Sequence, residues 1–241
     1  MSEEIKQDIQ KDLVEAGVVF GHSVSKRHPK MKPYISRVKG FIDIIDGVKT
    51  MEKLNAAIAF LKQSILDGKS IVVVGTKTQS KEVVREFAVA MNWPYVVERW
   101  LGGTISNFEV IKKRMFRFKD LKKGKEVGTW DKYTKKEQSE MTKEMQRLEK
   151  KIGGIKDIER YPDILFVLDI EKDELAVKEG KDYGLKIVGI TDTNVDPNAV
   201  DFMIPASDDS VSSIKYILDK IQKELSGLKP TVKTIVEPDK K

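Results

Sequence analysis

The sequence predicts an α/β fold in which a mostly parallel sheet is covered by helices on both faces and interrupted by a helical insertion. Short apolar runs at 70–74, 164–168 and 186–190 have the length and composition of strands that are buried on both faces. Amphipathic segments with helical spacing alternate with these runs, and this alternation is typical of βαβ units. Residues 104–151 break it with a long, highly charged stretch.

The alternating pattern begins with a predicted helix over 50–66, which ends near Gly68. A predicted strand over 70–74 follows, then a helix from about 80 to 91 and a short strand over 95–97. Because strand, helix and strand follow one another at short spacing, both strands should run parallel in one sheet.

The same pattern resumes after the insertion. A predicted strand over 164–168 precedes a helix over 172–183, and a strand over 186–190 comes next. A short strand over 202–204 leads to a last helix over 208–225. These segments should complete the sheet and its two helical layers.

The insertion is predicted to form a protruding antiparallel coiled-coil hairpin of two helices. Narrow apolar stripes run through both halves, and Gly124 and Gly128 permit the chain to reverse between them. Residues 109–151 carry 15 cations and 8 anions, which indicates either a nucleic-acid surface or a solvated surface laced with ion pairs. The first reading is favoured for the cations of the first helix that lack matching acids nearby, namely Lys112, Lys113, Arg114, Arg117 and Lys119.

These patterns divide the chain into three parts. An α/β domain comprises 1–103 and 152–228, the hairpin comprises 104–151, and 229–241 is expected to be a flexible tail. The chain has no cysteine, no apolar run of 18 residues and no leader-like N-terminus, so we expect a cytoplasmic protein without disulfides or a membrane partner.

Residues 21–40 have the most informative charge pattern. Six cations and no carboxylate lie in this stretch, whereas an ordinary solvated surface mixes charges of both signs. Because Pro29 and Pro33 break helices, we expect an extended, loop-like arm. The pattern favours binding to a phosphate-rich partner, and a loop that only improves solubility is the alternative.

Motifs for an enzyme are weak. Residues 75–78 follow a strand and precede a helix, where α/β sheets bind phosphates, but they form neither a P-loop nor a GxGxxG motif. No acid–base or nucleophilic arrangement follows from the spacing of polar residues. A doubly wound enzyme or nucleotide-binding protein with a basic hairpin is therefore the less favoured function class, and no small-molecule substrate is expected.

Aspartates gather at predicted strand ends and helix starts. Their oxygens could hold Mg²⁺ or Zn²⁺, although helix capping and turn formation explain the same positions. The set comprises Asp169, Asp192, Asp201, Asp208 and Asp209.

Short blocks of sequence occur in a fixed order over residues 13–225. They are LVEAG at 13–17, FGH at 20–22, HPKMKPYI at 28–35, VGTK at 74–77, RWLGGT at 99–104, NF at 107–108, PD at 162–163, TDTN at 191–194, DP at 196–197, Asp201, IP at 204–205 and DD at 208–209. Jointly they resemble the bacterial-type small-subunit ribosomal protein two family (the S-two family). Val19 departs from the histidine of many members, and Arg27-His28 replaces their Trp-Asn.

The resemblance implies a flavodoxin-like sheet with a protruding helical hairpin, in a structural protein of the small ribosomal subunit that is not an enzyme. It implies binding to small-subunit rRNA and to neighbouring ribosomal proteins, including help in docking the mRNA-binding ribosomal protein one. No cofactor is required, but some members hold a divalent metal at positions that match Asp192, Asp208 and Asp209.

The predicted RNA contacts combine these matches with the charge pattern. Trp100 among them either stacks on a base or anchors the hairpin against the domain. The set comprises Lys26, Arg27, His28, Lys30, Lys32, Tyr34, Arg37, Lys77, Arg99, Trp100, Gly102, Gly103, Thr104, Asn107, Lys112, Lys113, Arg114 and Arg117.

Overall fold

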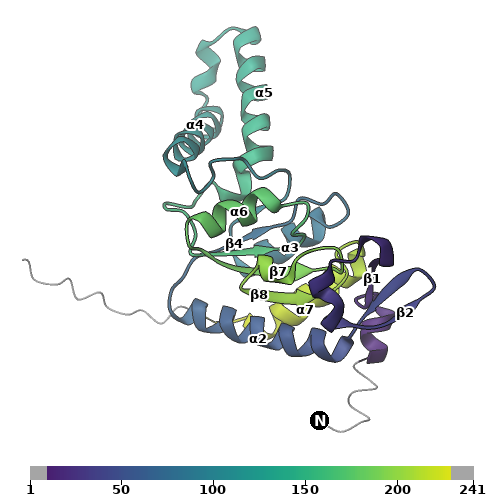
Figure 1. The fold of residues 1–241 in the computed structure, drawn as a ribbon. Coiled ribbons are helices and arrows are strands. Elements are labelled where there is room, and N and C mark those ends of the chain that lie inside the picture. Colours follow the sequence, from purple (N-terminus) through teal and green to yellow (C-terminus); the bar gives the residue numbers. More distant parts are fainter. Residues whose placement is uncertain (1–9, 229–241) are drawn as a thin grey trace, which may run out of the picture.

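A five-stranded parallel sheet forms the centre of the fold in the computed structural model, which describes residues 10–228 (Figure 1). Its strands lie in the order β5-β4-β6-β7-β8, and every neighbouring pair is parallel. The bounds are β4 Ile71–Val74, β5 Tyr95–Val96, β6 Ile164–Val167, β7 Lys186–Thr191 and β8 Phe202–Pro205. In chain order this is the flavodoxin-like arrangement, so the predicted fold class is confirmed.

Strand residues alternate between two apolar cores. In β4, Val73 joins the core on one face of the sheet, whereas Val72 and Val74 join the core on the other. In β6, Phe166 and Leu165 divide in the same way. This period of two, with apolar residues at every position, explains why the strands appear in the sequence as unbroken hydrophobic runs.

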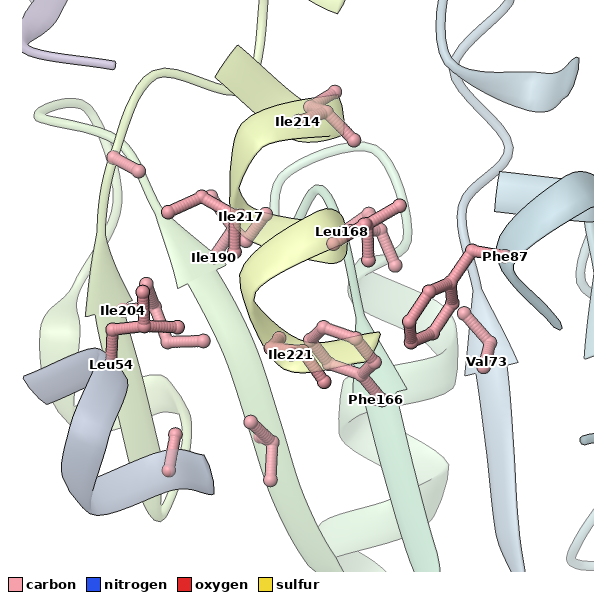
Figure 2. Close-up of a cluster of buried hydrophobic side chains, with 14 of the residues drawn as sticks. Leu54, Val73, Phe87, Phe166, Leu168, Ile190, Ile204, Ile214, Ile217 and Ile221 are labelled. Atoms are coloured by element: carbon pink, nitrogen blue, oxygen red, sulfur yellow. The ribbon is translucent and has the colours of Figure 1, made fainter. Parts of the chain in front are cut away.

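The helices cover both faces. α2 (Gly47–Leu66), α3 (Lys81–Met91) and α7 (Val211–Leu225) enclose the first core, where α7 lays its isoleucines against Phe166 and Leu168 (Figure 2). α6 (Glu174–Asp182) and the base of the hairpin enclose the second core. Each of these helices lies within a few residues of the bounds predicted from the sequence.

The hairpin consists of α4 (Phe108–Glu126), the 3₁₀ turn η3 (Thr129–Lys132) and α5 (Lys135–Ile152), and it projects away from the sheet in Figure 1. A capping box between Thr134 and Glu137 fixes the start of α5. The structure thus confirms two antiparallel helices, while their supercoiled packing as a coiled coil stays a prediction. Within residues 10–228, no helix has both the length and the apolarity that crossing a bilayer requires.

A further 3₁₀ turn, η4 (Gly153–Ile155), connects the hairpin to the sheet. It lies against the edge strand β5, and Gly154 makes this possible, because a Cβ atom there would come within 2.3 Å of the carbonyl oxygen of Tyr95. The stem of the hairpin therefore covers the outer side of β5.

The prediction of a loop-like arm over 21–40 is wrong. The segment folds into β1 (Phe20–Ser23), the 3₁₀ turns η1 (Val24–Lys26) and η2 (Pro29–Tyr34), and β2 (Ile35–Lys39). β1 and β2 both pair with β3 (Ile42–Ile45), giving a three-stranded antiparallel sheet. Proline does not prevent this fold, because Pro29 occupies the first position of a turn, where its missing N–H is not needed. We call residues 20–45 the N-terminal module.

A buried ion pair stabilises the N-terminal module. Asp43 of β3 is completely buried, and Arg27 grips its carboxylate with two nitrogens, Nε donating to Oδ2 at 2.7 Å and Nη2 to Oδ1. The Arg27 side chain as a whole is 23% exposed. Arg27 is therefore committed to the fold, which its earlier assignment as an RNA contact did not anticipate.

Replacing Arg27 with alanine should reduce the free energy of unfolding by about 3 kcal/mol, because it leaves the buried Asp43 charge without a partner. Lys26→Ala, which removes an exposed neighbouring charge, should stay within about 0.5 kcal/mol of the parent. Urea denaturation measures both. In the double variant with Asp43→Asn the two losses should be strongly non-additive, and simple additivity would show that the pair does not stabilise the module.

Candidate nucleic-acid interface

The N-terminal module presents cations that are not engaged in the fold. Lys26, Lys32, Arg37 and Lys39 are exposed, and among residues 10–228 no carboxylate lies within ion-pair distance of them. Lys30 differs, since its Nζ donates to Asp196 Oδ2 at 2.7 Å. The predicted excess of cations therefore remains exposed in the folded module.

Two other predicted contacts of this module have structural roles. The backbone N–H of His28 donates to the carbonyl of Thr193 at 2.8 Å, and its Nδ1 accepts from the N–H of Lys30 at 3.3 Å. Tyr34 is half-buried and packs against the second core. Both residues help to seat the module on the α/β domain.

A buried acid binds the backbone of the loop between β5 and α4. Glu179 of α6, only 9% exposed, accepts hydrogen bonds from the N–H groups of Gly103 (2.6 Å) and Ile105 (3.1 Å). Gly103 has φ +89°, a conformation that glycine adopts without strain. Thr104 is buried and donates its hydroxyl to the carbonyl of Leu101 at 2.6 Å, so this loop is rigid.

Trp100 is a packing residue. It is 4% exposed and belongs to the second core, beside the base of the hairpin. Stacking on a base requires an accessible ring face, so the structure favours the anchoring alternative over stacking. In the same loop Arg99, Gly102 and Asn107 are exposed, which leaves them accessible to a ligand.

The hairpin carries a basic groove between its two helices, about 470 Å³ in volume. Lys113 and Arg114 are exposed on its α4 side, and Arg147 and Lys151 contribute from α5.

The expectation that the first helix lacks matching acids is wrong for two residues. Arg117 forms a double hydrogen bond with Glu144 (3.1 and 2.9 Å), and Lys119 lies 3.0 Å from Asp157. Both acids are remote in sequence, so local inspection could not find them. Lys112, half-exposed on α4, has no acid at ion-pair distance among the described residues.

The predicted acidic corner forms, with a lysine at its centre. Nζ of Lys77 lies 2.7 Å from Asp208 Oδ1, 2.7 Å from Asp209 Oδ1 and 3.1 Å from Asp169 Oδ2. Burial lowers the pKa of Lys77, but the hydrogen bonds to Asp208 and Asp209 outweigh burial and raise this pKa well above its usual value. Lys77 therefore compensates part of the negative charge of the corner, and its side chain is engaged with these aspartates rather than presented as an exposed RNA contact.

His22 joins the same corner from β1. Its Nδ1 lies 3.1 Å from Asp192 Oδ2, and its Nε2 lies 3.3 Å from Asp209 Oδ2. The Asp192 carboxylate raises the pKa of His22, whereas burial, followed by the charges of Asp169 and Asp192, raises the pKa of Asp208 to about 7. His22, Asp208 and Asp209 each offer one ligand atom within 4.8 Å of the others. Sequence reasoning missed His22 as a potential ligand.

Another buried acid, Asp173, lies beside the corner. Asp173 is 3% exposed and accepts two hydrogen bonds from Thr76, at 3.1 Å from the N–H and at 2.8 Å from the hydroxyl. Burial raises the pKa of Asp173 to about 6, while the two hydrogen bonds from Thr76 oppose this rise. This pair fixes the turn that leads from β4 to Lys77.

Comparison with known proteins agrees with this architecture. A profile of the ribosomal protein S2 family matches residues 13–226. The chain belongs to the ribosomal protein S2 family. It is similar to the small ribosomal subunit protein uS2 of Coprothermobacter proteolyticus, with 44% identity over 211 residues that cover 88% of this chain and 79% of that protein. Family membership confirms the predictions of a structural constituent of the small ribosomal subunit and of a protein that is not an enzyme.

Asp173→Asn should abolish one source of the pH dependence of folding stability in this S2-family protein. With a folded pKa of about 6 against about 3.9 when unfolded, Asp173 binds more protons in the folded state between pH 4 and 6, so its contribution to stability falls as pH rises. Asparagine carries no charge, and it can accept the N–H of Thr76 with its oxygen while its amide group donates to the Thr76 hydroxyl. The stability of the variant relative to the parent should therefore increase by about 2–3 kcal/mol from pH 4 to pH 7.

Denaturation at a series of pH values measures this difference. Asp182→Asn, an exposed substitution at the end of the same helix, is the matched control and should show no such trend. A difference between Asp173→Asn and the parent that stays constant over pH would contradict the prediction.

Proposed function

We propose that this protein binds small-subunit rRNA, chiefly through the N-terminal module and the first helix of the hairpin. One observation carries the proposal: four exposed cations of the module, Lys26, Lys32, Arg37 and Lys39, have no acidic partner among the described residues. Exposed cations gathered without anions repel one another, and a phosphate backbone relieves that repulsion.

The fold supports this proposal by separating two classes of basic residue. Arg27 and Lys77 neutralise buried aspartates, so they stabilise the protein rather than the complex. Lys113 and Arg114, in contrast, extend the exposed basic surface along α4, and Arg99 lies in the rigid loop at the base of the hairpin. We infer that these exposed cations make the phosphate contacts.

Neighbouring proteins of the small subunit are partners that follow from family membership. Docking of the mRNA-binding ribosomal protein one is a finer proposal, supported by the family resemblance alone. The basic groove of the hairpin would favour an acidic segment of any such protein neighbour.

Replacing Lys26, Lys32, Arg37 and Lys39 together with alanine should weaken binding to small-subunit rRNA and leave the fold intact. The slope of log K against log[salt] should lessen by roughly 0.7–0.9 for each phosphate contact removed, thus by about 3 for four contacts. Filter binding at several salt concentrations measures the slope. A control variant that has the same net charge as this variant loses four exposed lysines of α2, α7 and the loop after α2 instead: Lys62, Lys69, Lys215 and Lys223. Equal slopes for the two variants would refute the assignment.

We further propose a divalent metal at the acidic corner. The donor set of one imidazole and two carboxylates suits Zn²⁺ better than Mg²⁺, and Asp192 beside Nδ1 would orient His22 with Nε2 toward the ion. Bound there, the ion would supply a positive charge and a cross-link between β1 and the start of α7. Lys77 already contacts both carboxylates, so an ion would have to compete with its ammonium group.

Zn²⁺ should raise the melting temperature of the parent, and neither His22→Gln nor Asp209→Asn should show this gain. Asp219→Asn, an exposed aspartate on α7, is the matched control and should retain it. Differential scanning calorimetry with and without a chelator makes the comparison. If Zn²⁺ and Mg²⁺ both leave the parent unchanged, Lys77 and His22 compensate the corner without an ion and the metal proposal is wrong.

A further inference from the structure

The turn between β2 and β3 exposes an aromatic ring. Gly40 and Phe41 form a two-residue connection, with Lys39 and Ile42 paired on either side. Gly40 has φ +63° and Phe41 does not share the positive φ, which is the pattern of a type II′ turn. Phe41 is 85% exposed, the highest fraction among the large apolar side chains that the structure describes.

The backbone beneath this ring is fixed. The strand pair holds the turn on both sides, and the N–H of Val24, at the start of η1, donates to the carbonyl of Phe41 at 2.9 Å. The Arg27–Asp43 ion pair ties η1 and β3 together below it. A ring on a rigid turn loses little conformational entropy when it binds a partner, so its position is preorganised.

The surroundings of Phe41 indicate the chemistry of the partner. Val24, Val38 and Ile42, which lie nearby in the same module, are also exposed apolar residues. Arg37 and Lys39 are exposed residues of the adjacent strand β2, and no carboxylate occurs from 21 to 40. The nearest acid in the sequence, Asp43, is buried and paired. The partner must therefore offer both a flat apolar surface and negative charge.

We propose that Phe41 stacks on an unpaired base of small-subunit rRNA while Arg37 and Lys39 contact the adjacent phosphates. This inference rests on the proposed function and names the residue that recognises a single-stranded site. Every base has a face on which an aromatic ring can stack. Because bases and phosphates alternate along an RNA strand, a ring with cations beside it can contact a base and its neighbouring phosphates together. A protein partner is less favoured, because a stable interface covers about 800 Å² per side, whereas this apolar tip is a narrow projection.

The test measures binding of the full chain to protein-free small-subunit rRNA transcribed from the genome that encodes it. Phe41→Ala should lower the affinity roughly 5- to 150-fold, the range that loss of one stacked base covers. Its salt slope should equal that of the parent, because no phosphate contact is lost. Phe41→Trp should restore the affinity, and fluorescence of the new indole should be quenched on binding. Tyr161→Ala, which removes another exposed aromatic ring remote in sequence, is the control and should bind as the parent does.

The outcomes separate this inference from the proposed function. If the parent binds rRNA and Phe41→Ala binds equally well, the stacking proposal is overturned and rRNA binding stands. If Phe41→Ala binds rRNA normally but enters assembled subunits poorly, the tip contacts a protein, and stacking is again overturned. Failure of the parent itself to bind would overturn the proposed function and this inference together. Melting temperatures check the fold, which so exposed a substitution should leave unchanged.

Discussion

The rest of the structure depends on charge compensation at the carboxyl edge of the parallel sheet. Several aspartates reach this edge from different segments, and buried carboxylates in such proximity would repel one another if left alone. Lys77, presented by the turn after β4, contacts three of them and thereby links β4, the end of β6 and the start of α7. The sheet edge that serves as a ligand site in many doubly wound folds is here occupied by the protein's own ammonium group.

The same edge positions the basic surface. Gly21 lies so close to Thr193 that a Cβ atom would come within 2.5 Å of its methyl group, and the N–H of His22 donates to the hydroxyl of Thr193 at 2.9 Å. With the bond from His28 to the same residue, the turn after β7 holds β1 and the chain before η2. The acidic corner and the N-terminal module are therefore one connected unit, held together through Thr193.

Sequence patterns predicted the parallel sheet and its helices because the spacing of buried apolar residues within a single segment indicates whether that segment is a strand or a helix. They failed where the outcome depends on pairing between distant segments. The stretch 21–40 has the pattern of a loop-like arm because its strands carry exposed cations and form their sheet only with β3, which lies outside this stretch. Asp43 did leave a signal, since a lone carboxylate within an isoleucine-rich run must find a cation if it is buried. Glu179 left a similar signal, because it lies three residues after the buried Ala176 on the same face of α6. No sequence pattern, however, identifies the N–H groups that Glu179 binds.

The contact between Gly154 and Tyr95 gives the hairpin a second role at the edge of the sheet. The outermost strand of an open sheet presents unpaired amide and carbonyl groups, which invite pairing with another chain. Because η4 covers β5, the stem of the hairpin shields that edge in addition to supporting the helices beyond it. Shortening the hairpin at its tip would leave this shield intact, whereas excising it at the stem would uncover β5 and favour self-association. The projection most remote from the sheet is thus anchored in a segment that covers the edge of the sheet.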